Sequence, residues 1–257
     1  KVTILTNGNY VVSTNRLANG QPASRLCSIS QQCVGQMTEN NSLIGAPGVG
    51  VDFDGVYPLP DGNYVVVNRG WNGERGAVTW VNGSTGLNGL VSSANSLVGG
   101  TARDFVGSRG VTVLANSGYV VLSEIWQDSS ATRRGAATFG PAGGGISGIV
   151  SPDNSLIGAG TGSFSQSKVV ALTNGNYVVS IPNAILPGTG FLGAAVWGSG
   201  STARNVTITR SIIGSSTSLK GSPRGSVRRK SRSSVLKISA SRFTKLKTGC
   251  RSRCVPS

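Results

Sequence analysis

The 257-residue chain contains no histidine and only nine acidic residues. Without histidine, Ser-His-Asp and Cys-His catalytic arrangements and His-based metal sites are excluded. Acid–base catalysis would fall to carboxylates, as in glycosidases. The nine candidate carboxylates include Asp52, Asp54, Asp61, Glu74, Asp104, Glu124 and Asp128. Because these acids fall mainly in predicted turns and loops, where solvated acids belong, we expect no enzyme and no catalytic residues. A carboxylate-based glycosidase is the alternative.

Cysteine, methionine and long apolar runs are scarce too. No run of apolar residues approaches the length of a membrane span, so we expect no membrane-spanning segment. Four cysteines do not make a disulfide scaffold in a chain of this length, although Cys27 and Cys33 are placed to bridge across a turn in an oxidising compartment. The spacing to Cys250 and Cys254 is poor for zinc, so no metal and no cofactor is expected. The first residue is Lys1 and Met37 is the only methionine, so we expect a processed product or a fragment of a longer protein.

What the chain does contain is a fourfold internal repeat. The tyrosines of its first marker are separated by steps of 54, 55 and 58 residues. The copies of this marker are NGNYVV at 7–12, DGNYVV at 61–66, NSGYVV at 116–121 and NGNYVV at 174–179. A second marker reads RGAVTW at 75–80, RGAATF at 134–139 and LGAAVW at 192–197. A third reads NSLIG at 41–45, NSLVG at 95–99, NSLIG at 154–158 and RSIIG at 210–214. Such a period indicates one supersecondary unit copied in tandem.

Each unit is predicted to be built from β-hairpins. The first marker places an Asn-Gly or similar pair between apolar runs, which predicts a two-residue reversal at Asn7-Gly8 and its equivalents. A second hairpin is expected in which the strand Ala77 to Val81 is joined to a return strand at Leu90-Val91-Ser92. With about four strands a unit and no helical periodicity, the fold class is all-β. Tight hairpins favour a β-propeller-like array of four-stranded units over the alternative, a β-solenoid.

The predicted repeat domain covers residues 1–219 and is followed by a basic tail at 220–257. Its units run over about 1–55, 56–110, 111–168 and 169–219. The repeat domain holds 12 basic and 9 acidic residues, whereas the tail holds 12 basic residues and no acid. The tail is therefore read as disordered, as the product of a shifted reading frame, or as a non-specific binder of polyanions.

The three markers resemble the tandem repeats of very large bacterial surface exoproteins of the filamentous-haemagglutinin-like, two-partner-secretion kind. The resemblance covers residues 2–214, and the first unit departs from it where 25–30 read RLCSIS in place of GAVTW. It implies an extracellular or cell-surface, adhesin-like protein without catalysis. It supplies no catalytic residue that transfers to this chain.

Aromatic residues supply the candidate binding site. Trp80, Phe139 and Trp197 recur at one strand position and are expected to fill the space between units. Trp71 and Trp126 recur in a polar loop, seven residues after the tyrosine of their units. Exposed loop tryptophans beside polar residues suit stacking on sugars, and the alternative is that they cap the edge of a unit. The candidate ligand-binding residues are Trp71, Trp126, Asn68, Arg69 and Glu124.

The sequence therefore predicts a secreted or surface-exposed bacterial repeat protein with an adhesive or structural binding role. Host or cell-surface glycans are the expected partners, and a lectin-like carbohydrate-binding propeller is the first alternative. The sequence does not give the oligomeric state or the identity of a ligand.

Overall fold

The chain is all-β, as predicted, and is built from small sheets that follow the tandem units. The computed structural model describes residues 1–31, 33–46, 54–186, 190–191 and 193–201. The predicted tail at 220–257, the fourth copy of the third marker at 210–214, and Asp52 lie outside the described residues. The described part contains no helix that is long and apolar enough to cross a membrane.

The described strands fall into four units in chain order. Unit 1 contains β1 (Val2–Ile4), β2 (Tyr10–Thr14), β3 (Ala23–Cys27) and β4 (Leu43–Ile44). Unit 2 contains β5 (Gly55–Pro58), β6 (Tyr64–Asn68), α1 (Trp71–Glu74), β7 (Ala77–Val81), β8 (Gly89–Leu90) and β9 (Leu97–Val98). Unit 3 contains β10 (Val111–Val113), β11 (Tyr119–Ser123), β12 (Ala136–Gly140), β13 (Gly148–Ile149) and β14 (Ser155–Ile157). Unit 4 contains β15 (Lys168–Ala171), β16 (Tyr177–Ile181), β17 (Ile185–Leu186), β18 (Gly190–Phe191) and β19 (Ala194–Gly198).

Four strands pair antiparallel in each of the first three units. Their orders are β1-β2-β3-β4, β5-β6-β7-β9 and β10-β11-β12-β14. The first marker forms the second strand, the second marker forms the third strand, and the third marker forms the fourth. Unit 4 repeats the first three strands as β15-β16-β19. The described strands form separate sheets and no closed barrel.

The predicted second hairpin is wrong in its pairing. β7 is joined antiparallel to β9, in the third marker, and not to the segment at Leu90-Val91-Ser92. That segment contributes β8, which pairs in parallel with β4 of the preceding unit. The amide of Val91 donates to the carbonyl of Ile44 over 2.9 Å, which extends this pairing. β13 pairs in parallel with β9 in the same way, so the segment joins neighbouring units instead of closing its own.

The reversal in the first marker is also one residue longer than predicted. Leu5 and Asn9 close the turn with a hydrogen bond of 2.8 Å, and only Gly8 of the Asn7-Gly8 pair has a positive φ, at 87°. This is the three-residue hairpin with glycine in the left-handed region. In unit 3 the residue at this place is Ser117, which is held at φ 67°.

The third marker holds its turn with a set of side-chain bonds that is the same in units 1, 2 and 3. In unit 2, Asn95 accepts from the amide of Ser92 over 2.9 Å and donates to the carbonyl of Leu90 over 2.9 Å. In units 2 and 3 the serine that follows this asparagine is buried and bonds to the threonine of the second marker, as Ser96 bonds to Thr79 over 2.7 Å. The Asn-Ser pair therefore fastens the fourth strand to the third.

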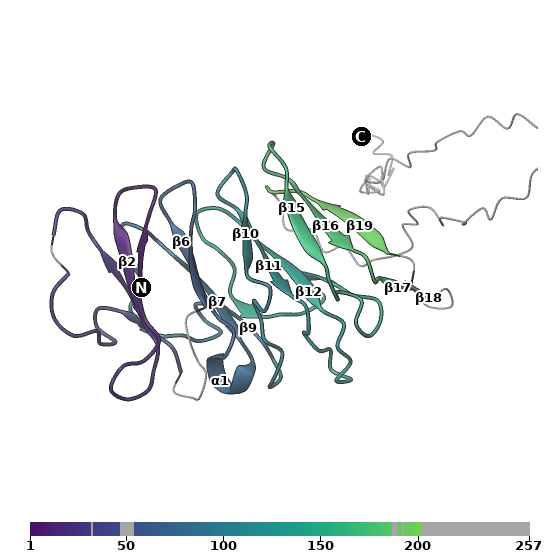
Figure 1. Cartoon of the computed structure of the whole chain (residues 1–257), viewed down its shortest axis with the longest axis horizontal. Coiled ribbons are helices and arrows are strands. Elements are labelled where there is room, and N and C mark those ends of the chain that lie inside the picture. The colour runs from purple at the N-terminus through teal and green to yellow at the C-terminus, as the bar shows by residue number, and fades with distance from the viewer. Residues whose placement is uncertain (32, 47–53, 187–189, 192, 202–257) are drawn as a thin grey trace, which may run out of the picture. The chain divides into compact units, whose positions relative to one another are not determined.

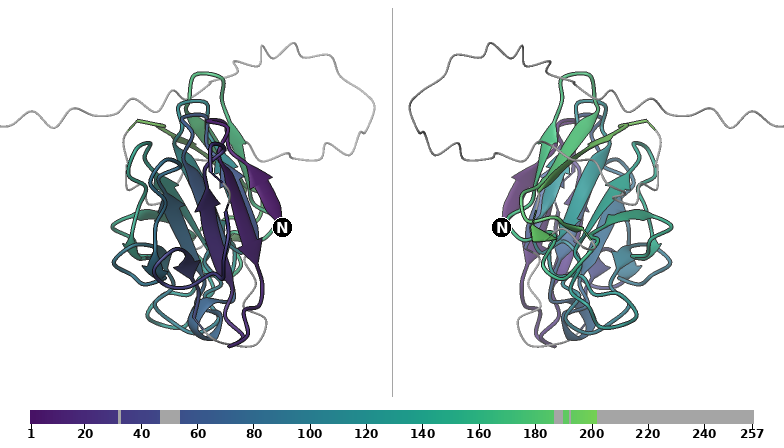
Figure 2. Two further views of the ribbon diagram at one scale, coloured as in Figure 1. Left: turned by 90° about the vertical axis from the view of Figure 1, so that its left-hand side faces the viewer. Right: turned by 90° about the vertical axis from the view of Figure 1, so that its right-hand side faces the viewer.

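The hydrophobic core lies between units and not within them. Three clusters of buried side chains join unit 1 to unit 2, unit 2 to unit 3, and unit 3 to unit 4. In β6, Tyr64 and Val66 belong to the first cluster, and Val65 and Val67 belong to the second. Successive side chains of a strand point to opposite faces, so a sheet between two neighbours buries both faces. Figures 1 and 2 show the sheets lying one behind another in chain order.

Unit 1 departs from the other units at the second marker, as its sequence indicated. A disulfide joins Cys27, the last residue of β3, to Cys33, with Cα atoms 5.4 Å apart. The bridge closes the turn that follows β3, where units 2 and 4 have glycine-containing turns.

The turn geometry makes a prediction about Ser117. A left-handed backbone costs an ordinary residue about 1–2 kcal/mol, and glycine escapes that cost but loses about 0.4–1 kcal/mol through its freer unfolded chain. Ser117→Gly is therefore expected to raise the free energy of unfolding by roughly 0.5–1 kcal/mol in urea titrations.

The matched control is the reverse change at the same turn of unit 1. A Cβ on Gly8 meets only the Cδ1 of Ile29, at 3.4 Å, so the space is open and the backbone alone decides the result. Gly8→Ser should lower the free energy of unfolding. If both variants changed the free energy of unfolding in the same direction, the left-handed backbone assigned to this turn position would be contradicted.

Candidate functional site

The predicted ligand-binding residues come from two equivalent loops, which follow β6 and β11. The prediction that Trp71 and Trp126 are exposed is wrong, because the two side chains are only 8% and 5% exposed. Trp71 packs in the cluster between units 1 and 2, and Trp126 packs in the cluster between units 2 and 3. Neither ring is available for stacking on a sugar.

The connectors to the following units pack against the loops that carry these rings. The glycine of the second marker permits the close approach, since a Cβ on Gly76 would lie 2.2 Å from the backbone nitrogen of Val106. In unit 3, a Cβ on Gly135 would lie 2.3 Å from the Cβ of Phe164. The arginine before each glycine then ties the connector down. For Arg134 this bond goes to the carbonyl of Ala159 over 2.6 Å.

Asn68 is also unsuited to bind a ligand. It is the last residue of β6 and is 1% exposed. Its side-chain amide has no hydrogen-bond partner among the described residues. The candidate site as predicted therefore loses three of its five members, and Arg69 and Glu124 remain at the surface.

Arg69 and Glu124 each take part in an ion pair, and the two pairs occupy equivalent positions with the charges exchanged. In unit 2 the pair is Asp54 with Arg69, at 2.7 Å. In unit 3 it is Arg109 with Glu124. Each pair joins the residue ten positions before the unit's tyrosine to the residue five positions after it. Glu124 also accepts from the amide of Gln166 over 3.0 Å, which links units 3 and 4.

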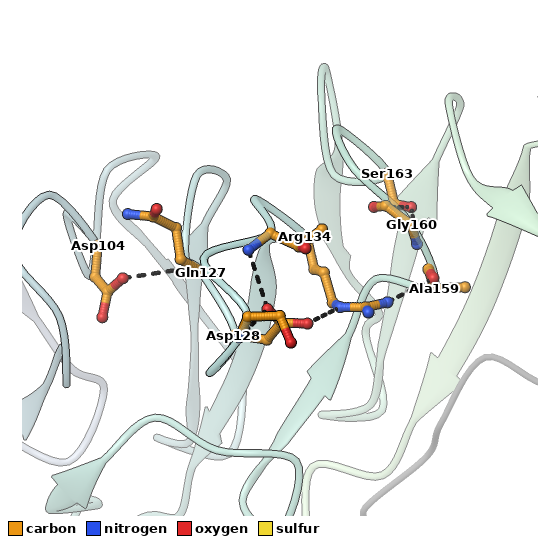
Figure 3. A network of polar contacts seen from close by, with 9 residues as sticks. Asp104, Gln127, Asp128, Arg134, Ala159, Gly160 and Ser163 are labelled. Carbon is orange, nitrogen blue, oxygen red and sulfur yellow. Dashed lines mark hydrogen bonds and ion pairs between the residues drawn. The ribbon is translucent and has the colours of Figure 1, made fainter.

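A network of polar contacts fixes the loops beside Trp126 (Figure 3). Asp104 accepts from the amides of Thr101, over 2.8 Å, and Gln127, over 3.2 Å. Asp128 accepts from the amide of Thr132 over 3.0 Å and pairs with Arg134. These carboxylates bind backbone amides and the side chain of Arg134, and none of them is directed at a shared centre.

The two carboxyls of this network have opposite pKa shifts. Burial raises the pKa of Asp104, and the hydrogen bonds that it accepts and the charge of Arg75 offset only part of that rise. The pKa of Asp128 is lowered, chiefly by its hydrogen bond to Arg134 and further by amide donors. The described residues contain no cluster of three or more potential metal ligands.

The second-marker aromatic residues occupy the space between units where a following unit is described. Phe139 is 4% exposed and stacks on Tyr177 of unit 4 with ring centroids 5.9 Å apart. Trp80 lies against the loop of unit 3 that contains Gly145. The expectation fails for Trp197, which is 52% exposed, because no described unit follows it.

A row of surface grooves runs between successive units, at a place that sequence reasoning did not anticipate. The first groove includes Arg16 and Asp54, the second includes Asp54, Arg69 and Arg109, and the third includes Arg109 and Lys168. Because neighbouring grooves share Asp54 and then Arg109, they form one continuous row. We call this the groove row.

Sequence comparison agrees with the fourfold reading of the chain. The family described as "Repeat of unknown function (DUF5650)" matches four stretches, at residues 4–48, 58–108, 113–167 and 171–221. The chain belongs to this family. No curated protein matches the chain.

Each match to a DUF5650 repeat falls on one of the units described above. Each matched stretch begins at the last residue of a unit's first strand, so the family's repeat contains the markers in their structural order. The groove row lies between DUF5650 units, and no single repeat contains a whole groove. The sequence does contain one indication of the groove row, which is that the equivalent positions 54 and 109 carry opposite charges. Only an alignment of the units with one another reveals it.

The opposite pKa shifts of Asp104 and Asp128 predict opposite dependences of stability on pH. Above the ordinary aspartate pKa of about 3.9, native Asp104 still holds its proton while the unfolded chain has lost it, so its contribution to stability falls as pH rises through this range. Native Asp128 is ionised below that pKa, so its contribution rises as pH increases toward about 3.9 and is lost in acid.

Urea unfolding of the Asn variants between about pH 3 and pH 7 measures both contributions. Relative to the wild type, Asp104→Asn should gain stability as pH rises, and Asp128→Asn should lose it. Asp153→Asn, at an exposed turn, is the control. Parallel curves for the Asp104 and Asp128 variants would contradict the assigned surroundings.

Proposed function

We propose that this chain is a secreted or cell-surface repeat protein with an adhesive role, and that it binds acidic glycans along the groove row without catalysis. The observation that carries the proposal is the charge of the row. Its lining includes five basic side chains and one acidic one, which are Lys1, Arg16, Arg69, Arg109, Lys168 and Asp54.

The regular spacing of the grooves favours an extended ligand. Each groove lies between two successive units and includes two basic side chains, although these do not occupy equivalent positions of the repeat, so positive charge is present in every groove of the row. A linear polysaccharide with repeating carboxylate or sulfate groups matches such a surface, since arginine forms paired hydrogen bonds with those groups. The half-exposed side chains of Arg69 and Arg109, at 58% and 49%, are accessible to it.

Two further observations support an extracellular setting. The resemblance of the markers to filamentous-haemagglutinin-like exoproteins implies export and adhesion. The disulfide between Cys27 and Cys33 is of the kind that persists in oxidising compartments. A non-catalytic role is supported by Asp54, Asp104 and Asp128, each of which is engaged with an arginine or with backbone amides.

The lectin-like alternative that rested on Trp71 and Trp126 is withdrawn, because those rings are buried. Polyanion binding by the tail at 220–257 stays a prediction from its charge, and any test of the groove row must separate the two.

The test compares two double variants that change the net charge equally. Arg69→Ala with Arg109→Ala removes two arginines from the groove row, and Arg103→Ala with Arg133→Ala removes two exposed arginines outside it. The probes are polygalacturonate and heparin oligosaccharides, measured by calorimetry with the full chain. The groove variant should weaken binding by roughly tenfold or more, and the control by much less.

Each other result has a definite meaning. Equal losses for the two double variants would show that net charge alone, including that of residues 220–257, drives binding. No loss in either variant would exclude the groove row. Release of reducing sugar from these probes by the wild-type chain would overturn the non-catalytic part of the proposal.

A further inference from the structure

Each internal junction between units is made from the same two half-surfaces. A unit meets its successor through one set of alternate residues in its second strand, such as Val65 and Val67 of unit 2. The successor meets it with its tyrosine and the residue two positions later, such as Tyr119 and Val121 of unit 3. We call these half-surfaces the forward face and the backward face.

Polar bonds set the register of the junction at the first-marker turn. In unit 1, the hydroxyl of Thr6 donates to the carbonyl of Leu59 over 2.8 Å. The side-chain amides of Asn7 and Asn9 donate to the carbonyl of Gly83 over 2.9 and 2.8 Å. These donors belong to the forward face, and their acceptors belong to unit 2.

The forward face of unit 4 carries the same donors. Asn116 of unit 3, at the position of the first of the two asparagines, donates to Gly200 of unit 4 over 2.6 Å. Residues 5–13 and 172–180 are identical, both reading LTNGNYVVS. Asn174 is therefore equivalent to Asn7 and Asn116, each of which donates a hydrogen bond to the following unit.

The apolar part of this forward face is exposed. Trp197 is 52% exposed, whereas its equivalent Phe139 is 4% exposed beneath unit 4. Val170 of β15 is also 52% exposed. The last described unit therefore presents an aromatic and an aliphatic side chain that the internal junctions would cover.

The backward face of unit 1 is exposed in the same manner. Val2 and Ile4 of β1 are 62% and 73% exposed. Their equivalents in β10 are Val111 and Val113, which take the same places opposite the tyrosine strand and pack against the core between units 2 and 3. An apolar surface that is partly buried in unit 3 is thus open to solvent in unit 1.

Unit 1 also holds the acceptor positions. Leu5 takes the place of Leu59 in the turn, and both carbonyls accept the amide of the turn glycine. Ile29 takes the place of Gly83. The amide of Ile29 donates to the side chain of Asn9 over 3.1 Å, and the amide of Gly83 donates in the same way to the side chain of Asn63 in unit 2 over 3.0 Å. The two carbonyls needed by the donors of unit 4 are therefore at matching positions.

We propose that the forward face of unit 4 binds the backward face of unit 1 in a second copy of this chain. The contact repeats the internal junctions, with Trp197 against Tyr10 as Phe139 lies against Tyr177, with Val170 facing the strand of Val2 and Ile4, and with Asn174 as a donor. Because the two faces differ, the contact is heterologous, and it generates a filament or a closed ring. Self-assembly of this chain thus uses the forward face of unit 4 and the backward face of unit 1.

Sedimentation velocity of the full chain, from micromolar to submillimolar concentration, tests the proposal. The wild type should form a concentration-dependent series of oligomers. Trp197→Asp places a charge in the forward face and should prevent that face from binding. Ile4→Asp should do the same to the backward face, so each variant alone should remain monomeric. Mixed together, they keep one intact pair of faces and should form a 1:1 dimer and nothing larger.

Two further variants sharpen the test. Asn174→Asp removes the side-chain donor and should weaken association roughly fivefold. Unit 2 already has an aspartate, Asp61, at the equivalent position. Ile149→Asp changes an exposed apolar residue of unit 3, at 55% exposure, and should leave association unchanged. Circular dichroism checks that each variant keeps its β structure, and Val170→Asp replaces Trp197→Asp if that variant does not fold.

The outcomes against the proposal are equally definite. A wild-type chain that stays monomeric throughout overturns it. So does a monomer in which Trp197 is shielded from quenchers, because another part of the same chain would then cover the forward face. Association that survives in both single face variants would show that another surface is responsible.

Discussion

The burial of apolar side chains between units is the constraint on which the rest of the structure depends. A four-stranded unit of this size has two apolar faces and no interior of its own, so each face must be covered by a neighbour. β6 shows the result, since all five of its residues are buried although successive side chains point in opposite directions. The first-marker asparagines, the parallel pairs β4–β8 and β9–β13, and the connector loops all serve these junctions.

Much of the fold was predictable because the repeat exposes it. The apolar runs on both sides of the first-marker turn and the second marker predicted the first three strands, whereas the strand in the third marker was not predicted. The recurring aromatic position at Trp80 and Phe139 indicated packing between units. The pairing of Leu90 was missed because a short apolar run carries no information about which neighbour it joins. The turn length was missed because Asn-Gly suits both two-residue and three-residue reversals, and only the bond from Leu5 to Asn9 distinguishes them.

The candidate site was predicted less well, for a physical reason. Trp71 and Trp126 stand among polar residues in the sequence, yet each ring packs into the core that its unit shares with the preceding unit. Burial by a distant segment leaves no local signal. Arg69 and Glu124 were placed at the surface, but their meaning comes from Asp54 and Arg109, which belong to a different part of each repeat. Surfaces shared between units are therefore the place to seek function in this protein.

Native-state hydrogen exchange tests the central claim most directly, since it measures the protection of each strand separately. If cores form only between units, the amides of β6 and β11, which have neighbours on both sides, should exchange slowest and at similar rates. The equivalent strands of the first and last described units, β2 and β16, should exchange faster. Protection that is equal in all four units, or greatest at an end, would mean that each unit is stable by itself, and would contradict this account.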